Sequence, residues 1–247
     1  AFHLHHIEEL VIPGNVKEIG ESAFEDCRSL EAIELPNAKL IGAAAFADCR
    51  WLVTIRLPEA ITIERVAFTG CERLVTIEIP KATTIERFAF MKCERLEAIE
   101  IPKITSIKEN VFWNCRGLKT IKIPKAETIG RYAFNGCIQL EKIDLPSVTS
   151  IGEDAFMDCM RLKTINIPKV TSIKSGVFSG CRQLSRIELP SVTVIEQASF
   201  LHCANLVEVI APKTTRIEKG AFEDCKKWTK VTVARDCVID NSAFDVE

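Results

Sequence analysis

The chain has 247 residues, and its 32 basic and 34 acidic side chains leave a formal net charge of −2. A nearly neutral chain has no overall field that attracts nucleic acid or a membrane surface, so we expect neither as a partner. The longest stretch without Asp, Glu, Lys or Arg is the segment 197–207. This stretch is far too short to cross a bilayer, so we expect no membrane insertion.

A single pattern repeats along the chain at a constant interval. The interval is set by eleven phenylalanines, which are Phe24, Phe46, Phe68, Phe90, Phe112, Phe134, Phe156, Phe178, Phe200, Phe222 and Phe244. A Cys follows three places after all but the last of these, from Cys27 to Cys225, and prolines recur from Pro13 to Pro212 with only the first step one place longer. A fixed period of this length is typical of a solenoid. We therefore predict one repeat domain over residues 1–247, with about eleven rungs of which the first and last are incomplete.

Residues 1–13 match the end of a rung and are expected to contribute a first strand. In the complete rungs the segment 74–79 is typical: Ile77 and Ile79 are expected to point inward, whereas Thr76 and Glu78 point outward. Pro80 lacks the N–H group that a strand needs, so the strand ends there in each rung.

A short extended segment follows, and then apolar residues recur at the spacing of one helix face. In this rung they are Ile85, Ala89, Phe90, Cys93 and Leu96. We therefore predict one or two helical turns here. The combination is an α/β repeat solenoid in which stacked rungs bury the Phe, Cys and aliphatic columns.

The pattern A-F-x-x-C-x-x-L-x-x-I-x-I-P, as in 89–102, resembles the BspA-like class of leucine-rich repeats, and the resemblance covers residues 7–247. It implies a curved arc with parallel strands on its concave face, so that our predicted short helical turns lie on the convex face. Proteins of this class are often found on microbial surfaces, where they bind host proteins, other cells or glycans. The resemblance implies no enzyme and no cofactor. The last rung departs from the pattern at Trp228, Ala234 and Cys237.

The eleven cysteines suggest neither disulfides nor a metal site. Those in register occur once in each repeat, lack any close C-x-x-C pair, and fall in a core column. We interpret the ten as buried thiols that act as small apolar side chains. Cys237 is out of register, and it is the candidate for reactivity or intermolecular pairing.

The four histidines do not form a catalytic or metal-binding set. His3, His5 and His6 lie in a terminal segment without a fourth ligand, and we interpret them either as a remnant of added sequence or as a polar end cap. His202 stands alone in a column otherwise occupied by Asp, Gly and Lys, without the supporting carboxylate and nucleophile of a triad. We therefore expect no enzyme and no metal site.

A ligand face is predicted on the outward strand positions of the middle and C-terminal rungs. Adjacent rungs lie about 4.8 Å apart, so these positions form one rigid patch of mixed charge. Mixed charge suits a protein partner better than a uniformly charged glycan. The predicted ligand-binding residues are Lys122, Lys142, Asp144, Asn166, Arg186 and Glu188.

Two further surfaces are distinctive. The residue after the proline is basic in five rungs, and Arg235 follows the Ala234 that replaces the proline in the last rung. This column predicts either an ordinary solvated edge or a site for anionic polysaccharide; its basic residues are Lys81, Lys103, Lys125, Lys169, Lys213 and Arg235. Large apolar residues also stand in the predicted helical turns of successive rungs, where they either contact a second copy or lie flat over their neighbours; they are Phe88, Met91, Trp113 and Tyr132.

The sequence thus favours a non-catalytic protein-binding or adhesion module at a cell surface or in a secreted protein. The alternatives are an intracellular scaffold in the cytoplasm and a glycan-binding protein that uses the lysine residues. A homodimer is a further possible partner state. The chain starts with Ala1 rather than Met, which we interpret as a processed or cut chain.

Overall fold

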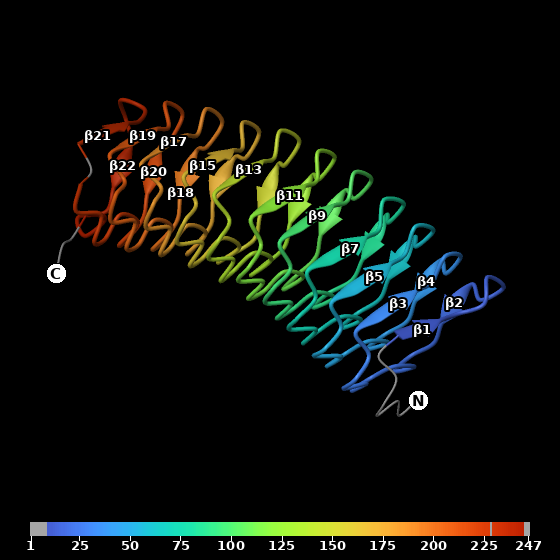
Figure 1. Cartoon of the computed structure of the whole chain (residues 1–247). Coiled ribbons are helices and arrows are strands. Elements are labelled where there is room, and N and C mark those ends of the chain that lie inside the picture. The colour runs from blue at the N-terminus through green and yellow to red at the C-terminus, as the bar shows by residue number, and fades with distance from the viewer. Residues whose placement is uncertain (1–8, 228, 245–247) are drawn as a thin grey trace.

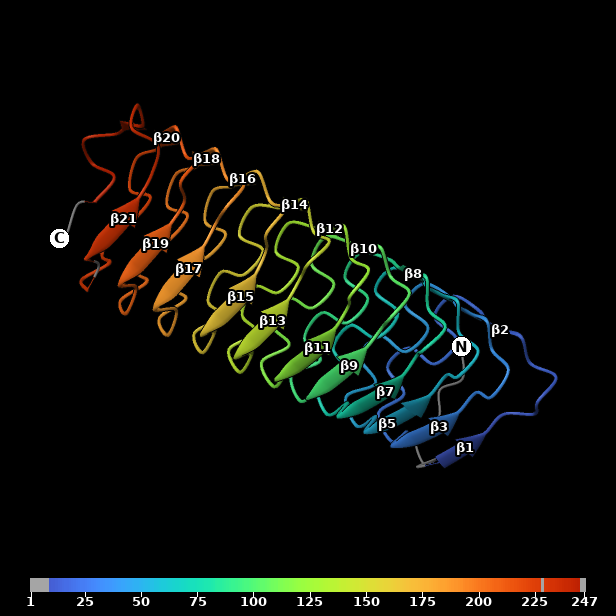
Figure 2. The same ribbon diagram turned by 90° about the horizontal axis from the view of Figure 1, so that it is seen from above.

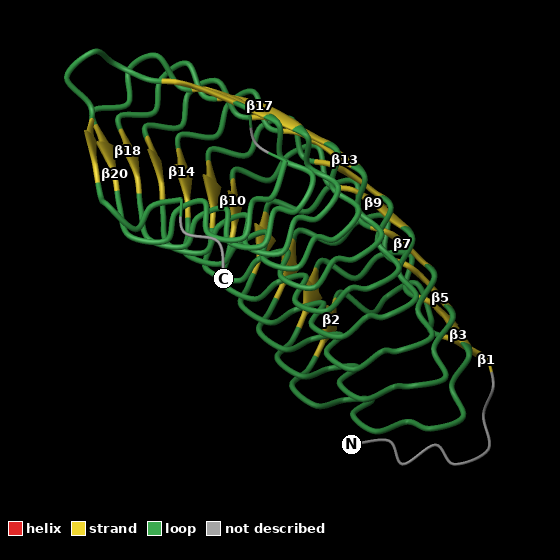
Figure 3. Cartoon of the chain, turned by 90° about the vertical axis from the view of Figure 1, so that its left-hand side faces the viewer, coloured by secondary structure: helices red, strands yellow, loops and turns green. Residues whose placement is uncertain are grey.

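The computed structural model describes residues 9–227 and 229–244. Figure 1 shows a stack of rungs along a bent axis, with the two ends of the chain at opposite ends of the stack. Each rung contributes a strand of three residues and a strand of two residues to different faces, which Figures 2 and 3 show from two further directions. The predicted solenoid of parallel strands is confirmed.

The odd-numbered strands have three residues, and we call them the long strands. They are β1 (Glu9–Val11), β3 (Ala32–Glu34), β5 (Thr54–Arg56), β7 (Thr76–Glu78), β9 (Ala98–Glu100), β11 (Thr120–Lys122), β13 (Lys142–Asp144), β15 (Thr164–Asn166), β17 (Arg186–Glu188), β19 (Glu208–Ile210) and β21 (Lys230–Thr232). They pair in parallel in the orders β1-β3-β5-β7-β9-β11, β13-β15 and β17-β19-β21. Equivalent residues of successive rungs face each other, as Ile55 faces Ile77.

The even-numbered strands have two residues, and we call them the short strands. They are β2 (Glu18–Ile19), β4 (Leu40–Ile41), β6 (Thr62–Ile63), β8 (Thr84–Ile85), β10 (Ser106–Ile107), β12 (Thr128–Ile129), β14 (Ser150–Ile151), β16 (Ser172–Ile173), β18 (Val194–Ile195), β20 (Arg216–Ile217) and β22 (Val238–Ile239). They form parallel ladders in the orders β2-β4-β6-β8, β10-β12-β14 and β16-β18-β20-β22.

In the second to tenth rungs, a β-turn at the proline connects the long strand to the short strand. In the fourth rung the N–H of Ala82 donates to the carbonyl of Ile79 over 3.1 Å, which places Pro80 at the second turn position. Proline suits that position because its ring restricts φ to the value that the turn requires there. Lys81 takes the third position and is exposed. The same bond recurs in other rungs, as from Ala126 to Ile123 over 3.0 Å.

The predicted helical turns are wrong: the described residues contain no helix. The segment around each core Phe is a succession of β-turns, and its N–H groups donate alternately within and between rungs. Met91 donates to the carbonyl of Phe88 in its own rung over 3.1 Å, whereas Lys92 donates to Trp113 of the next rung over 2.8 Å. Phe88 and Lys92 have φ of 63° and 59°, which interrupts a right-handed helix.

The core is a continuous column between the two strand faces and the turns. Ten successive pairs of Phe rings, from Phe24 to Phe244, stack with centroids 5.0 to 5.8 Å apart. Nine of the buried Cys thiols, from Cys49 to Cys225, donate to a Phe carbonyl of the preceding rung over 2.9 to 3.2 Å. The thiol column therefore satisfies backbone carbonyls that burial would otherwise leave with fewer hydrogen bonds.

Candidate binding surface

The long-strand face presents the first and third residues of each long strand to solvent. In β11, Thr120 and Lys122 are exposed and flank the buried Ile121. This alternation follows from the period of two along a strand. All six predicted ligand-binding residues lie on this face, in β11, β13, β15 and β17, and all six are exposed. Figure 2 shows these four strands side by side.

Two of the predicted residues are neighbours across a rung. The amide of Asn166 donates to a carboxylate oxygen of Asp144 over 2.7 Å, since the two residues face each other in the ladder. Lys122 instead contacts the preceding rung, where its Nζ lies 3.1 Å from Oε2 of Glu100. Lys142 makes no ion pair with any described residue. It is thus a cation of this face that a partner can reach without breaking an existing pair.

A four-residue ion-pair network occupies the C-terminal part of the face. Arg186 lies between two carboxylates, with Nη2 2.7 Å from Glu188 and Nε 2.9 Å from Glu208. Lys230 extends the network, with Nζ 3.2 Å from the other oxygen of Glu208. Hydrogen bonding from Lys230, together with Arg186, holds the pKa of Glu208 below its usual value.

These pairs orient the side chains more than they stabilise the fold. Their groups are largely exposed, and ion pairs in water contribute little because solvent screens them. Glu208 and Lys230 also belong to this patch, although neither is among the six ligand-binding residues predicted from the sequence. Opposite charges at equivalent positions of adjacent repeats, as in Glu100 and Lys122, are the feature of the sequence that predicts such ion pairs.

The post-proline lysines differ from the long-strand face in their ion pairing. Lys81 is paired with Glu59 at 2.6 Å. Lys103, Lys125 and Lys169, like Lys213, are exposed, and none of these four forms an ion pair among the described residues. This edge of the solenoid therefore carries unneutralised positive charge.

The four large apolar residues of the turns are half-buried, and none is strongly exposed. Met91 and Trp113 occupy one column in adjacent rungs, whereas Phe88 and Tyr132 are two rungs apart in another. Lys92 lies over the Trp113 ring at 5.8 Å, and the hydroxyl of Tyr132 accepts a hydrogen bond from its neighbour Arg131. A homodimer contact through these residues stays a prediction.

The cysteines take the buried positions that their register indicates. All ten in-register thiols are buried, whereas Cys237 is half-buried. Burial raises the pKa of Cys49 to about 12 and also raises that of Cys137. It raises the pKa of Cys237 as well, so this thiol is less ionised than an ordinary one. Since the thiolate is the reactive form, the environment of Cys237 does not activate it.

His202 has the carboxylate partner that the sequence did not reveal. Its Nδ1 lies 3.0 Å from an oxygen of Asp224 in the next rung. The described residues that line the shallow hollow beside this pair add only Arg182, Ala204 and Lys226, none of which is a nucleophile of the triad type. The His202–Asp224 pair therefore does not contradict the expectation that the protein is not an enzyme, and that expectation stays a prediction.

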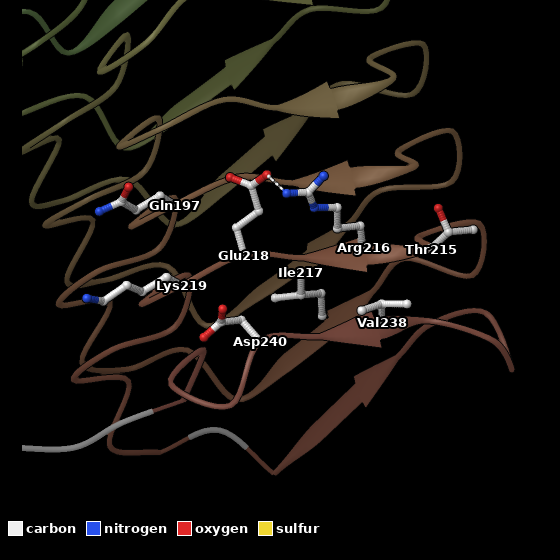
Figure 4. Close-up of a pocket in the computed structure, with 8 residues that line it drawn as sticks. All are labelled: Gln197, Thr215, Arg216, Ile217, Glu218, Lys219, Val238 and Asp240. Atoms are coloured by element: carbon white, nitrogen blue, oxygen red, sulfur yellow. Dashed lines mark ion pairs between the residues drawn. The ribbon is translucent and has the colours of Figure 1, made fainter.

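A hollow with a volume of about 700 Å³ lies on the short-strand face near the C-terminal end (Figure 4). Arg216 and Glu218, which form an ion pair of 3.0 Å, line it together with Lys219 and Asp240. Within the described residues no group of His, Cys, Asp and Glu is arranged to hold a metal ion. His3, His5 and His6 lie outside that part of the chain. The described residues also include no helix long and apolar enough to cross a bilayer.

A family model described as the BspA type leucine rich repeat region, with six copies, matches the chain over residues 1–119, 39–159 and 127–246. These matches together cover nearly the whole sequence. No curated protein sequence matches the chain.

Solved bacterial structures resemble the solenoid over most of its length. A leucine-rich repeat protein from Eubacterium ventriosum is 22% identical, with a TM-score of 0.58 over 97% of this chain and 82% of its own. One from Bacteroides ovatus is 22% identical, with a TM-score of 0.51 over 94% of this chain and 82% of its own. A leucine rich cell surface protein from Faecalibacterium prausnitzii is 22% identical, with a TM-score of 0.49 over 92% of this chain and 88% of its own. At these identities the first two likenesses show a shared fold.

Proposed function

Since the chain belongs to the BspA-type leucine-rich repeat family, we propose that it is a non-catalytic protein-binding module and that its long-strand face holds the partner. The observation that carries this proposal is the contrast between the two sides of the long strands. The middle residue is Ile in most rungs, and it is buried in most of them, as in Ile77 and Ile143. The residues on either side of it are exposed and differ from rung to rung, as Thr76 and Glu78 differ from Lys142 and Asp144.

A protein is the class of partner that this face fits best. Basic and acidic groups alternate on it, so a complementary pattern of both signs binds better than a chain of one sign. The ion pairs of Arg186 and the hydrogen bond from Asn166 to Asp144 hold side chains in defined positions before binding, which limits the entropy that association costs. The four strands β11 to β17 span about 15 Å at a rung spacing of about 4.8 Å, and the remaining long strands extend the same face.

The proposal includes a place of action at a cell surface or in the secreted fraction, because BspA-like proteins are often found on microbial surfaces. An intracellular scaffold that uses the same face is the alternative. Fractionation of the source cells distinguishes them, since a surface protein is released by brief protease treatment of intact cells. The expectation that the long-strand face is the concave one stays a prediction.

The test is a charge reversal on the long-strand face. A triple variant with Lys122→Glu, Asp144→Lys and Arg186→Glu is compared with the unmodified protein for binding to a partner captured from host extract and identified. We expect the affinity to fall at least about ten-fold, as for several mispaired charges at an interface. A control with Lys108→Glu, Lys174→Glu and Glu86→Lys, outside this face, changes the net charge equally.

The control is expected to bind as the unmodified protein does. Unchanged affinity of the face variant would contradict the proposal, above all if Trp113→Arg on the turn side weakened binding.

A further inference from the structure

The connection between the long and short strands forms one edge of the solenoid, which we call the proline edge. Eight exposed basic residues lie along it; they are Lys17, Lys39, Lys81, Lys103, Lys125, Lys169, Lys213 and Arg235. We propose that the proline edge is a second binding site, separate from the long-strand face, and that its ligand is a linear polysaccharide with regularly spaced carboxylate or sulfate groups.

The proline edge is basic although the whole chain is not. Against its eight basic residues it carries three acidic ones, Glu59, Glu127 and Asp236, whereas the chain as a whole has a net charge of −2. Positive charge is therefore concentrated on one edge, and the other surfaces are net acidic. Such segregation attracts an anionic chain to the edge and repels it elsewhere.

The charges on this edge are available to a ligand. Among the eight, only Lys81 forms an ion pair with a described residue, with Glu59 at 2.6 Å. The pKa of Glu59 is held below its usual value by the hydrogen bond from Lys81, and the charges of Lys39 and Lys17 add to the effect. Basic groups of the first, second and fourth rungs thus act at one carboxylate of the third rung. We expect an anionic group of a ligand that lies on neighbouring rungs to experience a positive electrostatic field similar to the one at Glu59.

The edge is rigid enough to read a regular ligand. Each post-proline lysine is held at the third position of a hydrogen-bonded β-turn, as Lys125 is by the 3.0 Å bond from Ala126 to Ile123. Lys125, Lys169 and Lys213 stand on every second rung, which is about 10 Å at the strand spacing of a sheet. Many acidic polysaccharides carry one charged group in each disaccharide, and an extended disaccharide has a similar length.

Hydroxyl groups accompany the lysines along the same edge. The residue two places after each post-proline position is an exposed Thr in six rungs; these are Thr83, Thr105, Thr149, Thr171, Thr193 and Thr215. Three of these hydroxyls donate to the carbonyl of the preceding rung, as Thr193 does to Thr171 over 3.2 Å. A hydroxyl that donates in this way still has lone pairs that accept hydrogen bonds from sugar hydroxyls.

The same columns favour a polysaccharide over a nucleic acid. Surfaces that bind single-stranded nucleic acid stack the bases on aromatic side chains. Neither the post-proline column nor the Thr column contains an aromatic residue among the described rungs. Hydroxyls beside isolated charges match a chain of sugar rings with intermittent anionic groups.

The test measures binding of the whole chain to defined polymers by biolayer interferometry. Hyaluronan serves as the probe with one carboxylate in each disaccharide, and chondroitin sulfate as the probe that carries a sulfate in addition to that carboxylate. Dextran is the neutral probe, and a single-stranded thymidine oligomer is the nucleic acid. The edge variant combines Lys125→Ser, Lys169→Ser and Lys213→Ser. Ser is compatible with this column, because Ser147 and Ser191 already occupy it. A charge-matched control combines Lys108→Ser, Lys174→Ser and Lys219→Ser on other surfaces.

We expect the unmodified protein to bind one of the two acidic polysaccharides. The edge variant should bind it about ten-fold more weakly, because three exposed contacts are lost. The control variant should keep the affinity of the unmodified protein. Added salt should weaken binding less in the edge variant, because fewer ion contacts remain. The proposal is overturned if neither acidic polysaccharide binds, if dextran or the oligonucleotide binds as tightly, or if both triple variants lose affinity equally. The edge variant should still bind the protein partner, because its three substitutions lie outside the long-strand face. The proposal for the proline edge can therefore fail while the proposal for the long-strand face holds, and the reverse.

Discussion

Gly130 and Gly20 provide a test of how closely the rungs pack. Both follow the Ile of a short strand, so they occupy the same column. A Cβ added at Gly130 would lie 2.6 Å from the backbone nitrogen of Glu109 and 2.6 Å from the carbonyl carbon of Lys108, both in the preceding rung. A Cβ added at Gly20 would have nothing within 4 Å. The change Gly→Ala is therefore the same chemical step in two different packing environments.

The expected effects have opposite sign. Replacing Gly by Ala lowers the entropy of the unfolded chain and stabilises a compatible site by about 0.4–1 kcal/mol. At Gly130 the backbone of the preceding rung must move, and overpacking of this kind costs about 1–3 kcal/mol. We expect Gly130→Ala to lower the free energy of unfolding by about 1–2 kcal/mol and Gly20→Ala to raise it slightly.

Urea denaturation followed by circular dichroism measures the difference. A gap of about 2 kcal/mol, with a slope of about 2–3 kcal/mol per molar urea, separates the two midpoints by roughly 1 M or less. Hydrogen exchange of the amide of Gly130, which donates to Ile107 over 2.7 Å, reports whether the loss is local. Equal shifts of the two midpoints in the same direction would refute the close approach of these rungs.

Three further results follow from the core. Phe134→Ala, which removes a buried ring stacked on both sides, should lower the free energy of unfolding by about 3–5 kcal/mol; a loss below about 1 kcal/mol in denaturant titration would contradict the stacking. A small alkylating reagent should label no more than the half-buried Cys237 in the native protein and all eleven thiols after denaturation; rapid native labelling of several thiols would show that the column is open. Because burial raises thiol pKa values, to about 12 for Cys49 from an ordinary value of 9.0, the contribution of the thiols to stability should be constant below pH 9 and should be lost as the pH rises toward 12. A melting temperature that stays level between pH 9 and 11 would contradict the buried, neutral state of the thiols.

The period and the burial of each column could be predicted from the sequence because both are local properties. Strand alternation needs only a period of two, and Pro80 marks the end of a strand by its missing donor. The outward placement of Lys122 and Asp144 followed directly from this alternation. The partners of Lys122 and Asp144 lie on adjacent rungs. They can be identified only by comparing equivalent positions of successive repeats.

The turn around each core Phe was assigned wrongly because two backbone paths give the same spacing of buried residues. A chain of β-turns buries Ala89, Phe90 and Cys93 as a helix would, while alternate N–H groups bond to the next rung. The distinguishing signal was present. The residue two places after Phe is Asp, Asn or Gly in eight of ten rungs, and these are the residues that most readily adopt positive φ.

The strict register of the rungs limits how the length of the molecule can change. Every turn amide that bonds outward, such as that of Phe90 to Val111, finds its acceptor in the equivalent place of the next rung. Gain or loss of one complete rung inside the stack leaves each such donor with an equivalent acceptor, whereas an insertion of a few residues shifts all later donors away from theirs. Recombination between repeats can therefore lengthen or shorten both binding surfaces in whole steps without the need for a new core.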